Sequence, residues 1–167
     1  MQNNIIVKPS TEQQFDRFLR QGRALFFSAP CGFGKTAVAE ALLSGREVLR
    51  LSADSADFSL PSAEADWQIL LLDDLQDMQE EQDWNALCEL IRACPERRFV
   101  LLSRGTPPGS LMAFQYTGLM TVLEADDLLF DADDVRRLLR LYGVEAADSE
   151  IDGILKESVG YPLGVAI

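Results

Sequence analysis

The sequence predicts an α/β fold, in which a parallel sheet lies between layers of helices and is followed by a smaller helical part. Short apolar runs alternate with amphipathic segments of helical period as far as residue 123. This alternation is typical of parallel βαβ units with right-handed crossovers. From Glu124 onward only the helical period remains. We therefore expect a sheet domain over residues 1–123 and a helical subdomain over residues 124–167.

Each strand is predicted from a short apolar run bounded by polar or turn residues. The run at residues 67–72 is nearly continuous, which suits a central strand covered on both faces. A β-type run at residues 5–7 opens the chain, and residues 52–65, rich in Ser, Asp and Ala, indicate a surface loop. The expected strands of the sheet are residues 24–27, 48–51, 67–72, 99–102 and 119–123.

Helices are predicted from the helical spacing of apolar residues and from capping residues at their ends. Ser10 and Thr11 are the N-cap candidates for the first helix, which should stop at Gly22. Asp131 and Ser149 are the N-cap candidates for the last two helices. The expected helices are residues 10–21, 37–43, 83–94, 131–143 and 149–160.

Composition restricts the chemistry that the chain can perform. Its 167 residues, 47% of them hydrophobic, suit one domain or one domain with a small appendage. The formal net charge of −12 argues against a nucleic-acid surface, because phosphate backbones require a basic face. The chain has no histidine, so the commonest general base and metal ligand is excluded. Catalysis would have to use carboxylates, lysine, arginine or a bound Mg²⁺.

The cysteines and the apolar runs indicate where the protein resides. Cys31, Cys88 and Cys94 fit neither a disulfide framework nor a zinc spacing, and they suit a reducing compartment. The longest apolar runs are too short to span a bilayer, and no signal peptide opens the chain. We therefore expect a cytoplasmic protein without membrane contact. The apolar stretch at residues 164–167 looks like the start of another helix, so we also expect a parent protein that continues beyond it.

The segment LFFSAPCGFGKTAVAEALL, residues 25–43, has the residue types of a phosphate-binding loop between a strand and a helix. Glycines allow the backbone N–H groups to approach a phosphate, and the helix N-terminus adds a partial positive charge. Lys35 would reach the β- and γ-phosphates, and the Thr36 hydroxyl would bind Mg²⁺. The residues expected to bind the nucleotide are Pro30, Cys31, Gly32, Phe33, Gly34, Lys35, Thr36 and Ala37.

One position departs from the full phosphate-loop pattern, because Ala29 stands where the first glycine is expected. The alternative interpretation is a glycine-rich turn before an amphipathic helix, in which Lys35 and Thr36 would have no chemical role. The strand-like and helical context on either side favours the phosphate loop.

Two further strand ends carry candidate site residues. The strand at residues 67–72 ends in Asp73 and Asp74, at the sheet edge where parallel α/β sheets bind ligands. Asp73 would hold Mg²⁺ through water, and Asp74 would orient or deprotonate a water attacking the γ-phosphate. Arg104 ends the next strand, where its cation could contact the γ-phosphate. The alternatives are ordinary turn aspartates and a surface arginine that offsets nearby acids.

Taken in order, SAPCGFGKT, ILLLDD, VLLSR and GYP resemble the nucleotide-binding module of the STAND class of signal-transduction ATPases. Within that class the chain is most similar to the large ATP-binding LuxR-type regulators, the MalT-like family, in which alanine at the first glycine position is usual. The resemblance implies a P-loop NTPase fold, related to AAA proteins, with a five-stranded parallel sheet of order 5-1-4-3-2. It also implies a small helical lid, in which Pro162 lies against the adenine or ribose.

The resemblance implies an ATP/ADP switch with slow Mg²⁺-dependent hydrolysis, catalysed with Lys35, Asp74 and Arg104. It also implies self-oligomerisation in the ATP state and a transcription-regulating, DNA-binding part beyond Ile167, because nothing in this acidic chain suits DNA contact. The alternative functions are a steady-turnover AAA-like ATPase or a small P-loop kinase. A further alternative is an interaction domain that has lost its nucleotide, which the intact Gly34-Lys35-Thr36 and Asp73-Asp74 disfavour.

Overall fold

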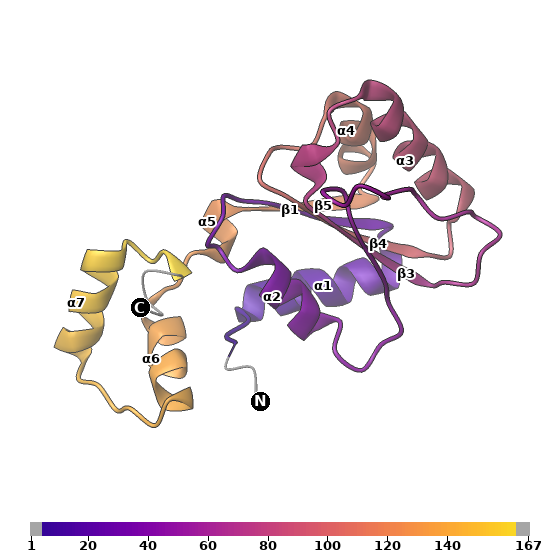
Figure 1. Cartoon of the computed structure of the whole chain (residues 1–167). Coiled ribbons are helices and arrows are strands. Elements are labelled where there is room, and N and C mark those ends of the chain that lie inside the picture. Colours follow the sequence, from indigo (N-terminus) through magenta and orange to yellow (C-terminus); the bar gives the residue numbers. More distant parts are fainter. Residues whose placement is uncertain (1–4, 163–167) are drawn as a thin grey trace.

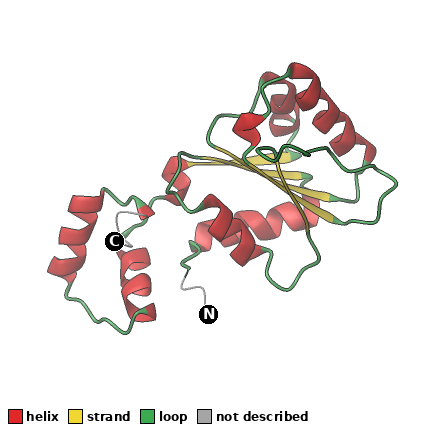
Figure 2. Cartoon of the chain, viewed as in Figure 1, coloured by secondary structure: helices red, strands yellow, loops and turns green. Residues whose placement is uncertain are grey.

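A computed structural model of the chain describes residues 5–162 (Figures 1 and 2). Its centre is one five-stranded, all-parallel sheet in the order β2-β3-β4-β1-β5. The expected order is confirmed, and every strand lies within about two residues of its expected bounds. The strands are β1 (Ala24–Ser28), β2 (Leu49–Ser52), β3 (Ile69–Asp73), β4 (Arg98–Ser103) and β5 (Met120–Glu124).

Central strands β1, β3 and β4 are buried on both faces, as their continuous apolar runs predict. Alternate residues point to opposite faces, so each strand supplies two hydrophobic clusters. Phe26 packs in the cluster on one face, and Phe27 packs in the cluster on the other. This arrangement fixes the register, because a slip of one residue would exchange the two sets.

Helices cover both faces of the sheet (Figure 1). Phe18 and Val38 pack into the cluster beneath α1 (Pro9–Gln21) and α2 (Lys35–Leu42). Leu87 and Leu111 pack into the opposite cluster beneath α3 (Glu81–Ala93) and α4 (Gly109–Tyr116). The single-turn helix η1 (Leu75–Asp77) follows β3.

Between β5 and residue 162 the chain forms helices and no further strand: α5 (Ala125–Leu128), α6 (Ala132–Leu141) and α7 (Asp148–Ser158). Figure 2 shows α6 and α7 side by side, away from the sheet. Asp131 caps α6, as expected, by accepting a hydrogen bond from the Asp134 backbone N–H. Val135 and Leu138 form the buried stripe of α6.

Two N-cap predictions are wrong. The first helix begins at Pro9, because proline suits the first helical position, so Lys8 is the N-cap and Ser10 and Thr11 lie inside the first turn. The last helix begins at Asp148, after the N-cap Ala147, and not at Ser149. The Glu150 side chain accepts a hydrogen bond from the Ala147 N–H, which stabilises this earlier start.

Other elements differ from the sequence prediction because they are short. Residues 5–7 form no strand, and they run beside α6 instead, where the Val7 carbonyl accepts a hydrogen bond from Arg137. Helix α4 was not predicted, since eight residues with only Leu111 and Phe114 buried give too little periodicity. No helix among residues 5–162 has the length and apolar character needed to cross a membrane.

Candidate nucleotide site

The loop of residues 29–34, here called the glycine loop, joins the carboxyl end of β1 to the first residue of α2. Gly32 and Gly34 have φ values of 88° and 74°, in the left-handed region that favours glycine. A Cβ built on Gly34 meets no atom within 4 Å, so it is the backbone conformation that requires glycine there. Lys35 and Thr36 begin α2, and the helix N-terminus therefore faces the same space as the loop.

Lys35 lies against the glycine loop. Its Nζ donates hydrogen bonds to the carbonyl oxygens of Ala29, at 2.5 Å, and Pro30, at 3.0 Å. Burial lowers the pKa of Lys35, while Cys31 and the carboxylate of Asp73 act in the opposite direction. The amine is therefore partly withdrawn from water and held beside the loop, ready to bind an anion.

Thr36 meets the end of β3. Its hydroxyl donates a hydrogen bond to Asp73 Oδ2 at 2.9 Å. The strand pairing explains this contact, because β1 and β3 both pair with β4 and end at the same edge of the sheet. The two side chains expected to hold Mg²⁺ are thus in direct contact.

Asp74 is held in one orientation. Its backbone is left-handed, with φ 55°, and its Oδ1 accepts a hydrogen bond from Gln76 Nε2 at 3.1 Å. Ser52 Oγ lies 3.0 Å from Asp74 Oδ2 and 2.7 Å from Asp54 Oδ1, so the two carboxylates share its single hydroxyl hydrogen. Left-handed backbone is uncommon outside glycine, although aspartate adopts it more readily than most residues, and strained conformations cluster at functional sites. The arrangement places a carboxylate at the sheet edge, in the same cavity as Lys35 and Arg104.

Gln76 also connects β3 to β4, because its Oε1 accepts a hydrogen bond from the Arg104 backbone N–H at 3.1 Å. Sequence reasoning missed both Gln76 and Ser52. The signal available for each was its position, since Ser52 directly follows a predicted strand and Gln76 stands two residues after the paired acids. Polar residues that directly follow strands at the carboxyl edge of a parallel sheet are candidate site residues.

These residues surround one space, here called the polar cavity, of about 340 Å³. The cavity brings together the predicted residues of three separate segments, the glycine loop, the end of β3 and the end of β4. Pro30 does not line it and touches the site only through its carbonyl contact with Lys35. The lining residues are Cys31, Gly32, Gly34, Lys35, Thr36, Ala37, Asp73, Asp74, Gln76 and Arg104.

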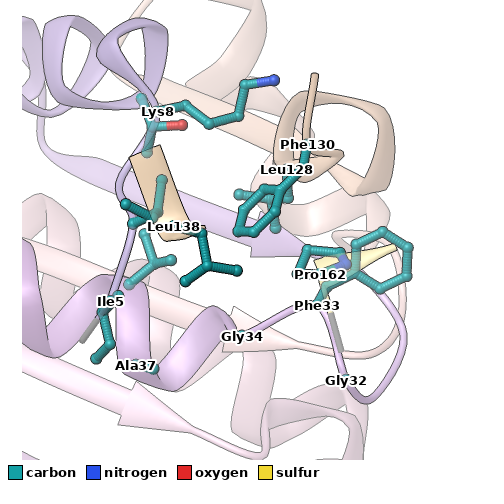
Figure 3. Close-up of a pocket in the computed structure, with 13 residues that line it drawn as sticks. Ile5, Lys8, Gly32, Phe33, Gly34, Ala37, Leu128, Phe130, Leu138 and Pro162 are labelled. Atoms are coloured by element: carbon teal, nitrogen blue, oxygen red, sulfur yellow. The ribbon is translucent and has the colours of Figure 1, made fainter. Parts of the chain in front are cut away.

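A second space of about 210 Å³, here called the apolar cavity, shares Gly32, Gly34 and Ala37 with the first. Figure 3 shows Pro162 and Phe33 together on one side of it and Ile5 on the other. The remaining wall comes from the C-terminal helices and the segments that join them, through Leu128, Phe130 and Leu138. Phe33 and Pro162 are among the residues expected to bind the nucleotide, whereas sequence reasoning missed the N-terminal contribution of Ile5, Ile6, Lys8 and Thr11.

Ion pairs and hydrogen bonds join the C-terminal helices to the N-terminal segment. Lys8 Nζ lies 3.3 Å from Asp134 Oδ2, and Asp134 is only 2% exposed. The Arg137 guanidinium donates a hydrogen bond to the Val7 carbonyl at 3.2 Å. Because Asp134 is buried, loss of Lys8 would leave an unpaired carboxylate out of water, so this pair favours the observed position of α6 against the N-terminal segment.

The fold and this geometry can be compared with known structures. A Walker-type ATPase of Pyrococcus abyssi matches 98% of this chain and 67% of its own length, with a TM-score of 0.63 and 13% identity. The chain has the fold of the P-loop ATPases. A signal transduction ATPase with numerous domains (STAND) from Pyrococcus horikoshii, which carries a tetratricopeptide repeat sensor, matches 96% of this chain with a TM-score of 0.61 and 10% identity.

A third structure, of a DNA replication initiation factor, matches 92% of this chain with a TM-score of 0.55 and 19% identity. The chain spans only 29% of the STAND protein and 58% of the replication factor. It matches no protein-family model and no curated protein sequence. These likenesses therefore establish the P-loop ATPase fold, and the chemistry must be argued from the residues.

The residues fit a nucleotide with Mg²⁺ better than a metal bound by protein ligands alone. Residues 5–162 contain no group of three or more His, Cys, Asp or Glu side chains that could hold a metal ion. Mg²⁺ keeps several waters and takes one or two protein oxygens together with phosphate oxygens. Thr36 Oγ1 and Asp73 Oδ2 provide two oxygens at the edge of a P-loop whose lysine amine faces the same cavity.

Proposed function

We propose that this chain is an adenine-nucleotide switch, a module that binds ADP or ATP with Mg²⁺ and hydrolyses ATP slowly. One observation carries the proposal: the polar and apolar cavities adjoin at the glycine loop and the start of α2, because Gly32, Gly34 and Ala37 line both. A phosphate chain requires the cationic, N–H-rich part, and a base requires the apolar part. Residues 125–162 form one wall of the base site, as a lid would.

Each residue of the polar cavity has a distinct part in the proposal. Backbone N–H groups of the glycine loop and the Lys35 amine bind the β- and γ-phosphates. Thr36 and Asp73 hold the Mg²⁺, which neutralises phosphate charge when it is bound. Asp74 orients or deprotonates the attacking water, and Ser52 and Gln76 keep its carboxylate aimed. The Arg104 side chain, which also lines the cavity, contacts the γ-phosphate.

A nucleotide can switch a protein between two conformations only if it makes different contacts with each of them. The lid supplies that difference in this proposal, because Leu138 and Pro162 reach the base site only when α6 and α7 lie as they do here. The sequence likeness to MalT-like regulators supports a STAND-type parent that oligomerises with ATP and carries its DNA-binding part elsewhere. We also propose that the protein is cytoplasmic and that its sheet domain and helical subdomain divide near residue 124.

The alternative of a steady-turnover ATPase rests on a different observation. Both oxygens of Asp74 already lie within hydrogen-bond distance of a side chain, Ser52 or Gln76, and such a preorganised carboxylate suits rapid catalysis. Turnover rate separates the two functions, because a switch must keep its nucleotide for longer than an enzyme would.

The deciding experiment is calorimetric titration of the nucleotide-free chain with ADP and ATP, with and without Mg²⁺, together with an ATPase assay. Tight ADP binding with turnover well below about 1 s⁻¹, the lower end for typical enzymes, supports the switch. Weak binding with rapid turnover supports the enzyme. Lys35→Ala should weaken binding at least about tenfold, because it removes a charge-assisted hydrogen bond. Lys156→Ala, at an exposed lysine of α7, is the matched control.

A further inference from the structure

Tyr161 joins the C-terminal helices directly to the glycine loop. Its phenolic hydroxyl donates a hydrogen bond to the Cys31 carbonyl oxygen at 2.7 Å, although the two residues are 130 positions apart. Its ring also meets the ring of Phe33 edge to face, with the centroids 5.0 Å apart. Both contacts are made to the segment of the loop that lines the two cavities.

The position of Tyr161 is fixed by the end of α7. Val159 and Gly160 have φ values of 54° and 73°, so the chain turns sharply after the helix. The Gly160 carbonyl accepts a hydrogen bond from the Phe130 N–H at 2.8 Å. A Cβ at Gly160 would lie 2.7 Å from the Phe130 carbonyl oxygen, which explains why glycine is required there. Tyr161 is therefore presented to the loop by backbone contacts and not by its own packing alone.

The geometry of the peptide group gives the hydrogen bond a consequence inside the polar cavity. The Cys31 carbonyl and the Gly32 N–H belong to one planar peptide group, and residues 5–162 contain no cis peptide bond. In a trans peptide these two groups point in opposite directions. Tyr161 holds the Cys31 carbonyl toward its own hydroxyl, so the Gly32 N–H of the same peptide group points away from Tyr161. Gly32 itself lines the polar cavity.

We propose that Tyr161 is a positioning residue for phosphate binding: by holding the Cys31 carbonyl, it aims the Gly32 N–H at the β-phosphate site. This inference rests on the proposed nucleotide function and goes beyond it. The same hydrogen bond makes phosphate binding and closure of the C-terminal helices favour each other, because each orders a group that the other needs. Tyr161 directly precedes Pro162, so these two adjacent residues link the phosphate contact of the glycine loop to the base contact of Pro162.

The test compares ADP with AMP, because AMP lacks the β-phosphate that the glycine loop surrounds. Tyr161→Phe removes only the hydroxyl and keeps the ring that meets Phe33. A single neutral hydrogen bond contributes about 0.5–1.5 kcal/mol, so we expect ADP binding to weaken about three- to tenfold. Binding of AMP should weaken clearly less, because AMP loses only the contribution of helix closure. Both affinities are measured by displacement of a fluorescent ADP analogue.

The matched control is Tyr142→Phe, at a tyrosine that follows α6 and is 59% exposed. It should leave the ratio of ADP to AMP affinity unchanged, and both variants should melt like the wild type. Equal weakening of ADP and AMP by Tyr161→Phe would mean that the hydroxyl only closes the base site, which overturns the positioning role. Unchanged ADP affinity overturns it as well. If the wild-type chain bound neither nucleotide, the proposed function itself would fail, and that result is distinct from the other two.

Discussion

Thr36 Oγ1 donates a hydrogen bond to Asp73 Oδ2 at 2.9 Å, and so joins the start of α2 to the end of β3. The two residues are 37 positions apart in the chain. They meet because parallel strands that share a sheet end at one edge. This contact gives the proposed Mg²⁺ site a geometry that can be tested by isosteric substitution.

Thr36→Val replaces the hydroxyl by a methyl group of similar size, and Thr36→Ser keeps the hydroxyl. We expect Thr36→Val to abolish most of the Mg²⁺-dependent gain in nucleotide affinity, by about tenfold or more, because a direct ligand is lost. Thr36→Ser should retain that gain. Titrations with and without Mg²⁺ measure the effect, and equal Mg²⁺ dependence in all three proteins would remove Thr36 from the metal site.

Asp74→Asn removes the carboxylate charge while keeping a side chain that can still interact with Ser52 and Gln76. ATP affinity should change little, and hydrolysis should slow about 10²- to 10⁴-fold, which is the usual contribution of a general base. Asp77→Asn, three residues along and exposed, is the control and should hydrolyse ATP at the wild-type rate. Undiminished turnover in Asp74→Asn would exclude its catalytic role.

Two glycines near the C-terminal end of the chain should respond in opposite directions to alanine. Gly160 has a φ of 73° and faces the Phe130 carbonyl, so Gly160→Ala should lower the free energy of unfolding by about 2 kcal/mol or more. Gly153 lies inside α7 with open space around it, so Gly153→Ala should raise that free energy by about 0.5–1 kcal/mol. Denaturant unfolding measures both, and a neutral Gly160→Ala would contradict the geometry of this turn.

Cys31 should be the reactive thiol of the folded chain. It is exposed, whereas Cys88 and Cys94 are buried, and burial raises the pKa of Cys88. A chromogenic disulfide reagent should therefore modify one cysteine rapidly in the native protein and all three after denaturation. Cys31→Ser should remove the rapid phase. Saturating ADP should slow it about tenfold or more, because Cys31 lines the polar cavity, and an unprotected Cys31 would place the phosphates elsewhere.

The lowered pKa of Lys35 predicts proton uptake on nucleotide binding. In the nucleotide-free folded protein, burial favours the neutral Lys35 amine and lowers its pKa below the ordinary value of 10.5. At pH values between these two pKa values, the folded chain therefore binds fewer protons at Lys35 than the unfolded chain does. In that window this group alone makes folding stability rise with pH. Bound phosphate favours the charged amine, so the pKa rises and a proton is taken up.

Calorimetric titration with ADP just below pH 10.5, in two buffers of different ionisation enthalpy, measures this uptake. The expected uptake is a fraction of one proton, and it should vanish near neutral pH, where the amine is already charged. Lys35→Arg is the control, because arginine stays protonated throughout this range. The same uptake in Lys35→Arg would assign the proton to another group.

Periodicity and glycine placement predicted most of the sheet domain. The apolar runs gave each strand to within about two residues, and the strand–loop–helix context located Lys35 and Thr36 at the start of α2. Asp73 and Asp74 were predicted as site residues because strand ends share an edge. These signals are local, so they can be recognised without knowing which distant segments meet.

The contacts that complete the site depend on segments far apart in the chain. Ser52 reaches Asp74 only because β2 pairs with β3, and Gln76 meets the Arg104 N–H only because β3 pairs with β4. Thr11 and Ile5 line the apolar cavity only because the N-terminal segment runs beside α6. The α/β alternation, the glycine loop and its lysine can be recognised in the sequence alone, since backbone conformation and charge are properties of neighbouring residues. The contact of Tyr161 with the Cys31 carbonyl becomes visible only in the folded chain, because a hydrogen bond across 130 residues leaves no periodic pattern in the sequence.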